Sequence, residues 1–223
     1  MHKHQDVSIC HPPLSLFQNM FLNFKDLTPN QVYGAMVQTI IPRPIAWVLS
    51  GNGDGSFNVA PFSFFNGVCS DPPLLMLSIG KKDSDEEKDT RLNIRERKKF
   101  VVHIPSARQI DKVNASSASL AHGESEVAIA DLELAPIEGF ELPQIVGCGI
   151  AMACELYRID EFGPESQAII YGTIISLSVS DDLIVPNEKN RFQLDPTQLD
   201  PLARLGGAYY ARIGDVLSAK RPK

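Results

Sequence analysis

Three features are missing from this sequence, and each absence argues against a class of protein. No segment approaches the roughly 18 consecutive apolar residues of a membrane-spanning helix, so we expect no membrane insertion. No G-x-G-x-x-G segment occurs, which argues against a dinucleotide-binding Rossmann domain. The four cysteines form neither a C-x-x-C pair nor a Cys/His cluster with zinc spacing. We therefore expect no metal site, and reduced, buried thiols of the kind found in the cytoplasm.

Positive charge is also in deficit. Lys and Arg total 21 against 27 for Asp and Glu, which gives a formal net charge of -6. This balance argues against sequence-independent binding of nucleic acid, which needs clustered Lys and Arg. A local phosphate site is still compatible with it, because a few correctly placed donors outweigh the mean charge. Apolar residues make up 43% of the chain, enough for one sizeable core.

The first 19 residues differ in character from the rest. They are polar and carry three of the five histidines, His2, His4 and His11, at a spacing that fits no fixed metal geometry. They also lack the apolar stretch and the small-residue cleavage site of a secretory signal, which favours a cytoplasmic location. We interpret residues 1–19 as an N-terminal extension and residues 20–223 as one soluble domain.

The remaining chain consists of short strand patterns with few helices between them. Thr28 as N-cap, with Gln31 closing a capping box, predicts a helix that ends before Pro42. Strands are expected over residues 45–49, 57–65, 74–79, 100–104, 150–159 and 168–179. Other helical segments are expected over residues 90–98, 106–121 and 200–203, with 122–147 irregular. Because no βαβ alternation appears, the pattern favours a barrel with peripheral helices.

The expected strand over residues 57–65 has an unusual composition. Pro61 cannot donate a ladder hydrogen bond, so the strand must break or lie at an edge there, which frees main-chain groups to face a ligand. Asn58 and Ser63 add short polar side chains, and the phenylalanines add flat apolar walls. This combination suits a planar heteroaromatic ring with a polar edge. A plain strand with a proline bulge is the alternative.

A second candidate segment runs from Lys88 to Asn93, where a loop enters the expected helix. A helix start presents unpaired N–H groups and a partial positive charge, which favour phosphate. Lys88 adds a cation, while Thr90 and Asn93 add hydroxyl and amide donors. The alternative is a capped surface helix beside a solvated run of charges.

Taken together, the motifs resemble a known family. They follow one another as Pro42-Arg43-Pro44-Ile45, Asn58-x-Ala60-Pro61-x-Ser63-x-Phe65, Asp71-Pro72-Pro73 and Lys88-Asp89-Thr90-x-x-Asn93. This set resembles the flavin reductase-like family, the FMN-binding split barrels of flavoredoxins and related reductases. The ending Arg204-Leu205-Gly206-Gly207-x-Tyr209, with Arg221-Pro222, is similar to one branch of that family. The likeness spans residues 20–222.

The resemblance implies a mainly β (α+β) fold, a six-stranded Greek-key split barrel with a few peripheral helices, assembled as a homodimer. It implies an oxidoreductase in which bound FMN does the chemistry, with NADH or NADPH as donor and a small molecule or a flavoprotein as acceptor. No catalytic side chain can be named. Asn58 to Phe64 would line the ring and the ribityl chain, and the residues from Lys88 to Asn93 would hold the ribityl chain and the phosphate. The cofactor-binding residues implied are Arg43, Asn58, Val59, Ala60, Pro61, Phe62, Ser63, Phe64, Lys88, Asp89, Thr90 and Asn93.

The sequence departs from the family pattern at one point. Two-component reductases of this family often carry a His near the nicotinamide site, but no His follows His122 here. This disfavours rapid NAD(P)H-dependent reduction of free flavin and favours FMN that stays bound. The alternatives are an FMN carrier or electron-transfer protein without its own nicotinamide site, and a barrel that has lost its flavin.

Four positions outside these motifs also carry expectations: His103, the pair His122-Gly123, Cys69 and Lys82. His103 alternates within an apolar strand, which favours a hydrogen-bonded structural histidine, and His122-Gly123 is typical of a turn. Cys69 is interpreted as a small packing residue rather than a partner of the flavin. Lys82 lies outside the matched motif and is expected to be an exposed charge, screened by water and salt.

Overall fold

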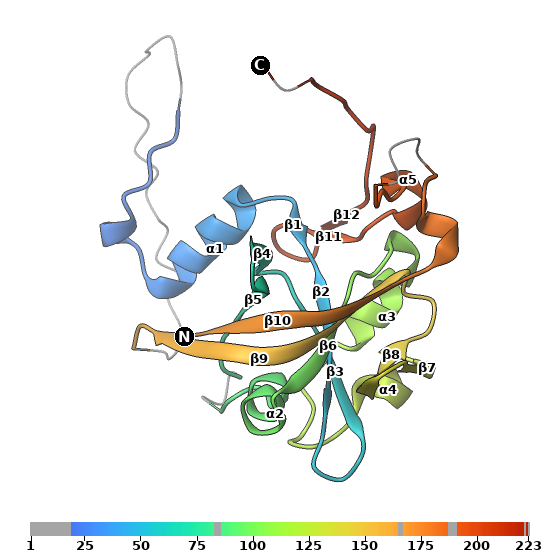
Figure 1. Ribbon diagram of the computed structural model, residues 1–223. Helices are drawn as coiled ribbons and strands as arrows, with labels where there is room; N and C mark the ends of the chain where they lie inside the picture. The colour runs from blue at the N-terminus through green and yellow to red at the C-terminus, as the bar shows by residue number, and fades with distance from the viewer. Residues whose placement is uncertain (1–18, 83–85, 165–166, 187–190, 221, 223) are drawn as a thin grey trace.

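The computed structural model describes residues 19–82, 86–164, 167–186, 191–220 and 222. His2, His4, His11 and Arg221 lie outside these described residues. A seven-stranded antiparallel sheet forms the body of the molecule, in the order β3-β2-β6-β9-β10-β5-β4 (Figure 1). The strands are β2 (Ala46–Gly51), β3 (Phe57–Phe62), β4 (Phe65–Ser70), β5 (Pro73–Ile79), β6 (Lys99–His103), β9 (Ile150–Phe162) and β10 (Gln167–Val179).

The sheet curls into a split barrel whose two edge strands are consecutive in the chain but, among the described residues, do not pair with each other. β3 and β4 lie at opposite ends of the strand order, yet only Ser63 and Phe64 separate them. The N–H of Ser78 in β5 donates to the carbonyl of Phe64 at 2.8 Å, which ties this link to the opposite side of the barrel. The mainly β split-barrel class is therefore confirmed. The sheet has seven strands rather than six because the expected strand over residues 57–65 bends at Ser63 and continues as β4.

Both faces of β2 are buried along its whole length, which agrees with its apolar run from Ala46 to Leu49. Alternate side chains enter two separate clusters. The cluster inside the barrel contains Ala46, Val48, Phe62, Leu75, Leu77, Ile79, Ile94, Phe100, Val102, Cys154 and Ile170. The cluster on the outer face contains Ile45, Trp47, Leu49, Val59, Val101, Val113, Ile137, Ile145, Cys148, Ala151 and Leu202.

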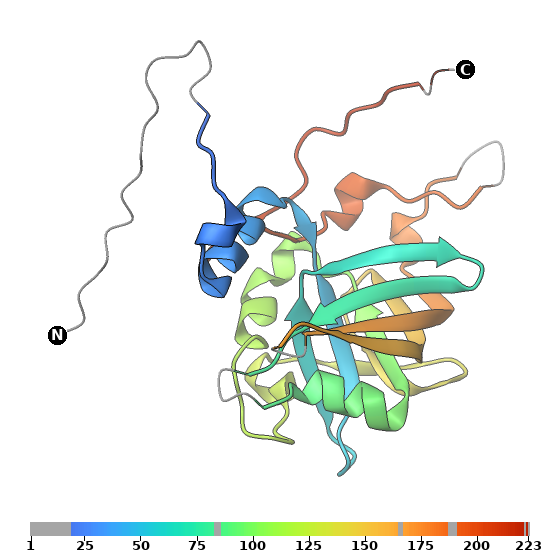
Figure 2. The same cartoon turned by 90° about the vertical axis from the view of Figure 1, so that its left-hand side faces the viewer.

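Two helices near the barrel behave differently. α1 (Pro29–Thr39) begins with the predicted capping box of Thr28 and Gln31, but none of its residues is buried. Figures 1 and 2 show it beside the barrel rather than across the sheet. α2 (Asp89–Arg97) carries five buried residues, and its Ile94 packs into the cluster inside the barrel. The alternative of a solvated surface helix at α2 is therefore wrong.

Three expectations about secondary structure are corrected. The helix expected over residues 106–121 is limited to a 3-10 turn, Ala107–Gln109, and α3 (Ile110–Ala115). The chain leaves α3 at Ser116, whose hydroxyl donates to the carbonyl of Val113 and accepts from Trp47 Nε1 at 2.8 Å.

The segment 122–147 is ordered rather than irregular. It contains α4 (Glu126–Ile129), capped by the Ser125 side chain, and a hairpin of β7 (Leu134–Ile137) and β8 (Phe140–Ile145). The helical turn expected over residues 200–203 lies earlier, as α5 (Pro196–Leu199), because Asp195 caps its start and Asp200 ends it in a left-handed conformation.

A small second sheet joins distant parts of the chain beside the barrel. β1 (Arg43–Pro44) pairs with β11 (Ala203–Arg204), which pairs with β12 (Tyr210–Ala211). The motif that begins at Arg204 thus lies next to Arg43, just before the β2–β3 hairpin. Across the described residues, no helix has both the length and the apolar character needed to span a membrane.

Candidate functional site

Strand β3 presents an unpaired edge, as its proline predicts. In the described part of the chain, β3 is the last strand in the sheet order and pairs with β2 alone, where Pro61 lies opposite Trp47. The chain then bends at Ser63 and Phe64 before entering β4. The prediction that Pro61 lies at an edge, close to a break, is confirmed. Main-chain groups on the free side of this segment can therefore face a ligand.

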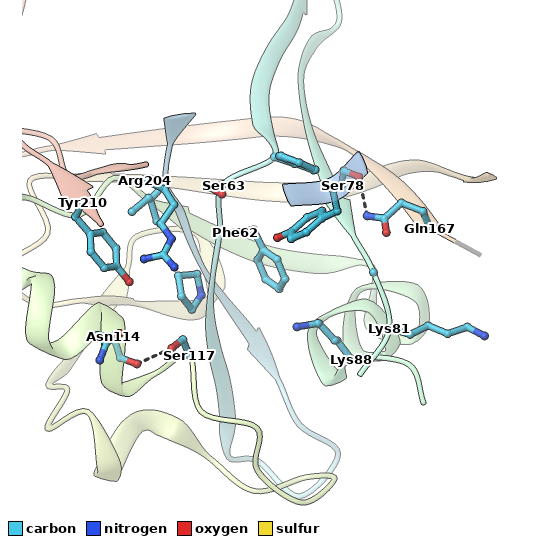
Figure 3. A pocket seen from close by; sticks show the side chains of 15 residues that line it. Phe62, Ser63, Ser78, Lys81, Lys88, Asn114, Ser117, Gln167, Arg204 and Tyr210 are labelled. Atoms are coloured by element: carbon cyan, nitrogen blue, oxygen red, sulfur yellow. Dashed lines mark hydrogen bonds between the residues drawn. The ribbon is translucent and has the colours of Figure 1, made fainter. Parts of the chain in front are cut away.

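A cavity of about 530 Å³ lies against this edge (Figure 3). It falls within the range of roughly 300–1,000 Å³ typical of small-molecule sites. Its walls combine aromatic rings with polar and cationic side chains drawn from β3, β5, α1, the α3 region and the small second sheet. The lining residues are Tyr33, Ile45, Pro61, Phe62, Ser63, Phe64, Ser78, Gly80, Lys81, Lys88, Asn114, Ser117, Gln167, Arg204 and Tyr210.

A smaller cavity of about 120 Å³ continues along the same strand. It shares Pro61, Phe62, Lys88 and Ser117 with the larger one, so the two form a single groove. We call the part near Lys82, Lys88, Asp89 and Thr90 the lysine end. The part of the larger cavity near Arg204 and Tyr210 is the arginine end. Figure 3 shows Arg204 and Tyr210 on one side of Phe62, and Lys81 and Lys88 on the other.

Under the lysine end, buried amides fix the start of α2 against the β2–β3 hairpin. Asn58 Nδ2 donates to Thr90 Oγ1 at 2.8 Å. Asn93 Nδ2 donates to Asn52 Oδ1 at 2.9 Å and to Ser50 Oγ at 3.2 Å. Because Thr90 Oγ1 accepts here, its own hydroxyl hydrogen stays available, and within the described chain it donates to no acceptor.

The start of α2 carries charge on both sides. Lys82 Nζ lies 3.2 Å from Asp89 Oδ2, and the ring of His122 contacts the other carboxylate oxygen of Asp89. The side chain of Lys82 is only 14% exposed, so the expectation of an exposed Lys82 is wrong. Lys88, by contrast, forms no ion pair among the described residues, and no side chain caps the helix.

Glu126 adds a buried carboxylate to the smaller cavity. Its Oε2 accepts from the N–H of Val59 at 2.8 Å. Desolvation by burial raises its pKa, and this effect outweighs the hydrogen bond from Val59. The backbone of β3 is thus held to α4 by a group that the sequence motifs did not reveal.

Arg43 is buried at the other end of the strand and bonds mainly to carbonyl groups. Its Nη1 donates to the carbonyls of Val37 and Ile40, both at 2.7 Å, and its Nη2 donates to that of Leu205 at 2.9 Å. Its Nε donates to Ser63 Oγ at 3.2 Å. Desolvation lowers its pKa, and nearby Arg204 adds to this effect. Arg43 therefore joins the C-terminal end of α1 to the turn after β11 and to the bend in β3.

Most of the predicted cofactor residues converge on this groove. It is lined by Asn58, Ala60, Pro61, Phe62, Ser63, Phe64, Lys88, Asp89 and Thr90. Arg43, Val59 and Asn93 do not line it: Val59 packs in the outer core, and Asn93 and Arg43 support the walls from behind. Their contact with a cofactor stays a prediction.

Several lining residues were missed by the sequence motifs. They are Tyr33, Asn114, Ser116 to Ser119, Glu126, Gln167, Arg204 and Tyr210, together with Lys82. The signals were weak, because these residues come from separate segments that only the closed barrel brings together. The run Ser116-Ser117-Ala118-Ser119 and the Arg204 motif were the best available clues.

The three remaining expectations have separate outcomes. His103 is fully buried, its Nδ1 lies 3.0 Å from the carbonyl of Trp47, and its Nε2 accepts from the N–H of Ile145. The prediction of a hydrogen-bonded structural histidine is confirmed. His122 and Gly123 form the predicted turn. Cys69 is exposed on β4, so its packing role is wrong, whereas Cys148 and Cys154 are buried free thiols as expected.

The flavin reductase like domain family matches residues 37–196 of this chain. The chain belongs to the flavin reductase-like family. An uncharacterized protein of Halalkalibacterium halodurans, BH2278, is 33% identical over 91% of this chain and 97% of its own length.

Two solved structures resemble this family member over nearly their whole length. The crystal structure of nitrilotriacetate monooxygenase component B from Bacillus cereus is 32% identical with a TM-score of 0.82, covering 90% of this chain and 98% of that one. Pseudomonas fluorescens 2-nitrobenzoate 2-nitroreductase NbaA is 30% identical with a TM-score of 0.78, covering 91% and 96%. The groove described above therefore belongs to a flavin-related oxidoreductase fold.

Proposed function

We propose that this flavin reductase-like protein is an oxidoreductase that binds FMN in the groove along β3. NADH or NADPH is the electron donor, and a small molecule or a flavoprotein is the acceptor. The observation that carries the proposal is the combination of an aromatic wall at Pro61 to Phe64 with a phosphate-compatible lysine end in one continuous groove. When bound, FMN supplies hydride acceptance and onward electron transfer.

The donor set at the lysine end fits a phosphate. Lys88 supplies a cation that has no acidic partner among the described residues. The first N–H groups of α2 receive no side-chain cap, and the Thr90 hydroxyl still has its hydrogen to donate. Asn58 holds Thr90 in this orientation from below. These residues would bind and orient the phosphate. The carboxylate of Asp89 beside them is paired with Lys82 and contacted by the ring of His122.

The wall beyond Lys88 fits a flat ring. Phe62 and Phe64 both line the larger cavity, and Tyr33 packs edge-on against Phe64 with ring centroids 6.2 Å apart. Ser63 lies between the two phenylalanines, and its Oγ accepts from Arg43 Nε. This arrangement would hold a planar ring, exclude water from one of its faces and offer polar contacts along its edge.

Binding and reduction can be tested on one preparation. We expect FMN to bind with roughly micromolar affinity or better, about -8 kcal/mol, and more tightly than riboflavin because the lysine end binds the phosphate. Anaerobic NADH or NADPH should then bleach the flavin absorbance. Equal affinity for FMN and riboflavin would overturn the phosphate assignment.

The runner-up function is an FMN carrier or electron-transfer protein without a nicotinamide site. The absence of a His after His122 favours it. Bleaching of the bound flavin by dithionite, but by neither nicotinamide nucleotide, would support the carrier and overturn the oxidoreductase. Of the two similar solved structures, one is named a 2-nitrobenzoate 2-nitroreductase and the other component B of nitrilotriacetate monooxygenase, which supports an oxidoreductase over a carrier.

We also propose that the protein is a homodimer. α1 buries none of its residues, and the apolar side chains of Phe21, Tyr33, Ile40 and Ile41 are exposed along this arm. Tyr33 also lines the larger cavity, so a second copy packed on α1 would approach the groove. Sedimentation should show a dimer at micromolar concentration, and a monomer would contradict it. The free thiols of Cys69, Cys148 and Cys154 support a cytoplasmic location, which cell fractionation can test.

A further inference from the structure

The larger cavity carries charge of one sign only. Among its described lining residues are three cations, Lys81, Lys88 and Arg204, and no carboxylate. The whole chain has a net charge of -6, so this distribution runs against the average composition. Excess positive potential in a concave, partly apolar site attracts anions. One phosphate at the lysine end accounts for Lys88, but it does not account for Arg204 beyond the opposite side of Phe62 (Figure 3).

Arg204 is held in place without being neutralised. Its guanidinium carbon lies 4.4 Å from the centroid of the Tyr210 ring, a stacked cation–π geometry. Its Nη2 donates to the carbonyl of Gly207 at 2.6 Å. No carboxylate within the described residues pairs with it. β11 and β12 carry the two side chains and pair directly, which fixes their relative position.

The remaining donors of Arg204 suit a planar oxyanion. Tyr210 covers one face of the guanidinium, and Gly207 takes one of the two hydrogens of Nη2, so one two-nitrogen edge is left for a ligand. A guanidinium edge binds carboxylates through two parallel hydrogen bonds, a geometry that a lysine cannot provide. Pro61 and Ile45 contribute apolar atoms to the lining of the same cavity. The arginine end can therefore hold a flat apolar body and its carboxylate together.

We propose that the arginine end is a second subsite, which binds a planar aromatic substrate through its carboxylate, with Arg204 as the specificity-determining residue. Tyr210 is a positioning residue that orients the guanidinium. The inference rests on the proposed function, because the FMN bound at the lysine end leaves the arginine end for an exchangeable ligand. It adds a substrate class to that function.

The test compares two ligands of nearly the same shape, of which only one carries a carboxylate. Benzoate and benzamide are titrated into the FMN-loaded protein, with binding followed by calorimetry and by the shift of the flavin absorbance. We expect benzoate to bind at least about tenfold more tightly, since a charge-assisted hydrogen bond contributes roughly 1.5–3 kcal/mol. Equal affinity for the two would overturn the proposal without reference to any variant.

A second pair of ligands distinguishes carboxylate from phosphate recognition. Nicotinamide mononucleotide and nicotinamide riboside differ by one phosphate. If Arg204 recognises a carboxylate, the ratio of mononucleotide affinity to riboside affinity should be the same in the parent protein and in Arg204→Gln. If only the mononucleotide depends on Arg204, the carboxylate assignment is overturned.

Matched variants locate the effect. Arg204→Gln should reduce the preference for benzoate over benzamide to near one, and Arg204→Lys should restore only part of it, because lysine lacks the bidentate edge. Tyr210→Phe keeps the stacked ring and should keep the preference, as should Lys99→Ala, a lysine outside the groove that pairs with Glu141. Unchanged preference in Arg204→Gln would overturn the assignment.

The two levels of the proposal fail separately. FMN content is measured for every variant by absorbance. A parent protein that binds no FMN would contradict the proposed function. A protein that binds FMN normally but does not discriminate benzoate from benzamide would contradict the second subsite alone. If Arg204→Gln loses FMN, the benzoate preference of the parent protein and of Arg204→Lys still decides the question.

Discussion

The two ends of the groove use their cations differently. At the lysine end, Lys82 is paired with Asp89, which His122 also contacts, and Lys88 alone is left without an acidic partner in the described chain. Behind the arginine end, the guanidinium of Arg43 donates hydrogen bonds to three carbonyls and a hydroxyl. Arg204, which lines this end, lies over the ring of Tyr210. Each end thus combines one cation committed to the fold with one available to a ligand.

This comparison shows that charge near a pocket does not by itself indicate a binding role. Arg43 belongs to a sequence motif as Lys88 does, and Lys82 lies in the loop just before the Lys88 motif, yet the partners of Arg43 and Lys82 belong to the protein. A committed cation stabilises the walls, and its removal should first affect folding or local potential. An available cation should affect ligand affinity with little change in stability. The predictions below separate these two kinds of cation.

The largest effect is expected for Arg43→Ala. This change leaves the carbonyls of Val37, Ile40 and Leu205 without their donor in a region that is 4% exposed at Arg43. These carbonyls are part-buried, so each should cost about 1 kcal/mol, the lower limit for an unsatisfied acceptor, and the loss should be about 3 kcal/mol in total. Urea unfolding measures it. The ratio of FMN to riboflavin affinity should stay unchanged, and a collapse of that ratio would instead place Arg43 at the phosphate.

His103 provides a buried polar group that does not line the groove. Burial lowers its pKa to about 4 from an ordinary value of 6.5. The unfolded chain therefore binds more protons than the folded one between these values. The contribution of His103 to the free energy of unfolding is fully present above pH 6.5. It is lost as the pH falls towards 4, by about 3 kcal/mol in total.

Unfolding at several pH values measures the effect of this group. His103→Gln keeps one donor and one acceptor but does not titrate, so its stability should be lower at neutral pH and should change less between pH 6.5 and 4. An equal slope in the parent and the variant would contradict the assignment.

The sequence predicted the lysine end far better than the arginine end. Asn58, Lys88 and Thr90 belong to local motifs whose spacing already implies a strand edge and a helix start. Arg204 and Tyr210 reach the groove only because β11 pairs with β1, a contact between residues 43 and 204 that no local pattern reveals. The break at Pro61 was predictable from its missing donor, but the closure of the barrel through Ser63 and Phe64 was not.

The same distinction explains the error about Lys82. In the sequence, Lys82 is one charge in a charged run that predicts a solvated loop. Spacing alone does not reveal that Asp89 is its partner. In the structure, Asp89 sits at the start of α2 and the chain folds back to bring Lys82 and His122 to it. Tertiary pairing, rather than local composition, decides which lysine of the run is committed.

The available cation of the lysine end is tested by Lys88→Ala. Loss of one charge-assisted hydrogen bond should weaken FMN about tenfold or somewhat more, with little change for riboflavin. Thr90→Val should act in the same direction, while Thr90→Ser retains the hydroxyl and should bind normally. Fluorescence titration gives both constants, and Lys99→Ala is the control. Equal losses for FMN and riboflavin would show that Lys88 does not contact the phosphate.

The smallest effect is expected for the committed cation, Lys82. Its removal leaves the carboxylate of Asp89 less well neutralised beside the phosphate site, which should weaken FMN about threefold through repulsion, since a partly exposed ion pair contributes less than about 1 kcal/mol. The double variant Lys82→Ala/Asp89→Asn removes both charges and should recover most of the lost affinity. Titration of FMN against all three variants, including Asp89→Asn alone, completes a double-mutant cycle. Additive losses would mean that Lys82 acts independently of Asp89. A loss in Lys82→Ala as large as that in Lys88→Ala would mean that both lysines bind the phosphate, and the distinction between committed and available cations at this end of the groove would be wrong.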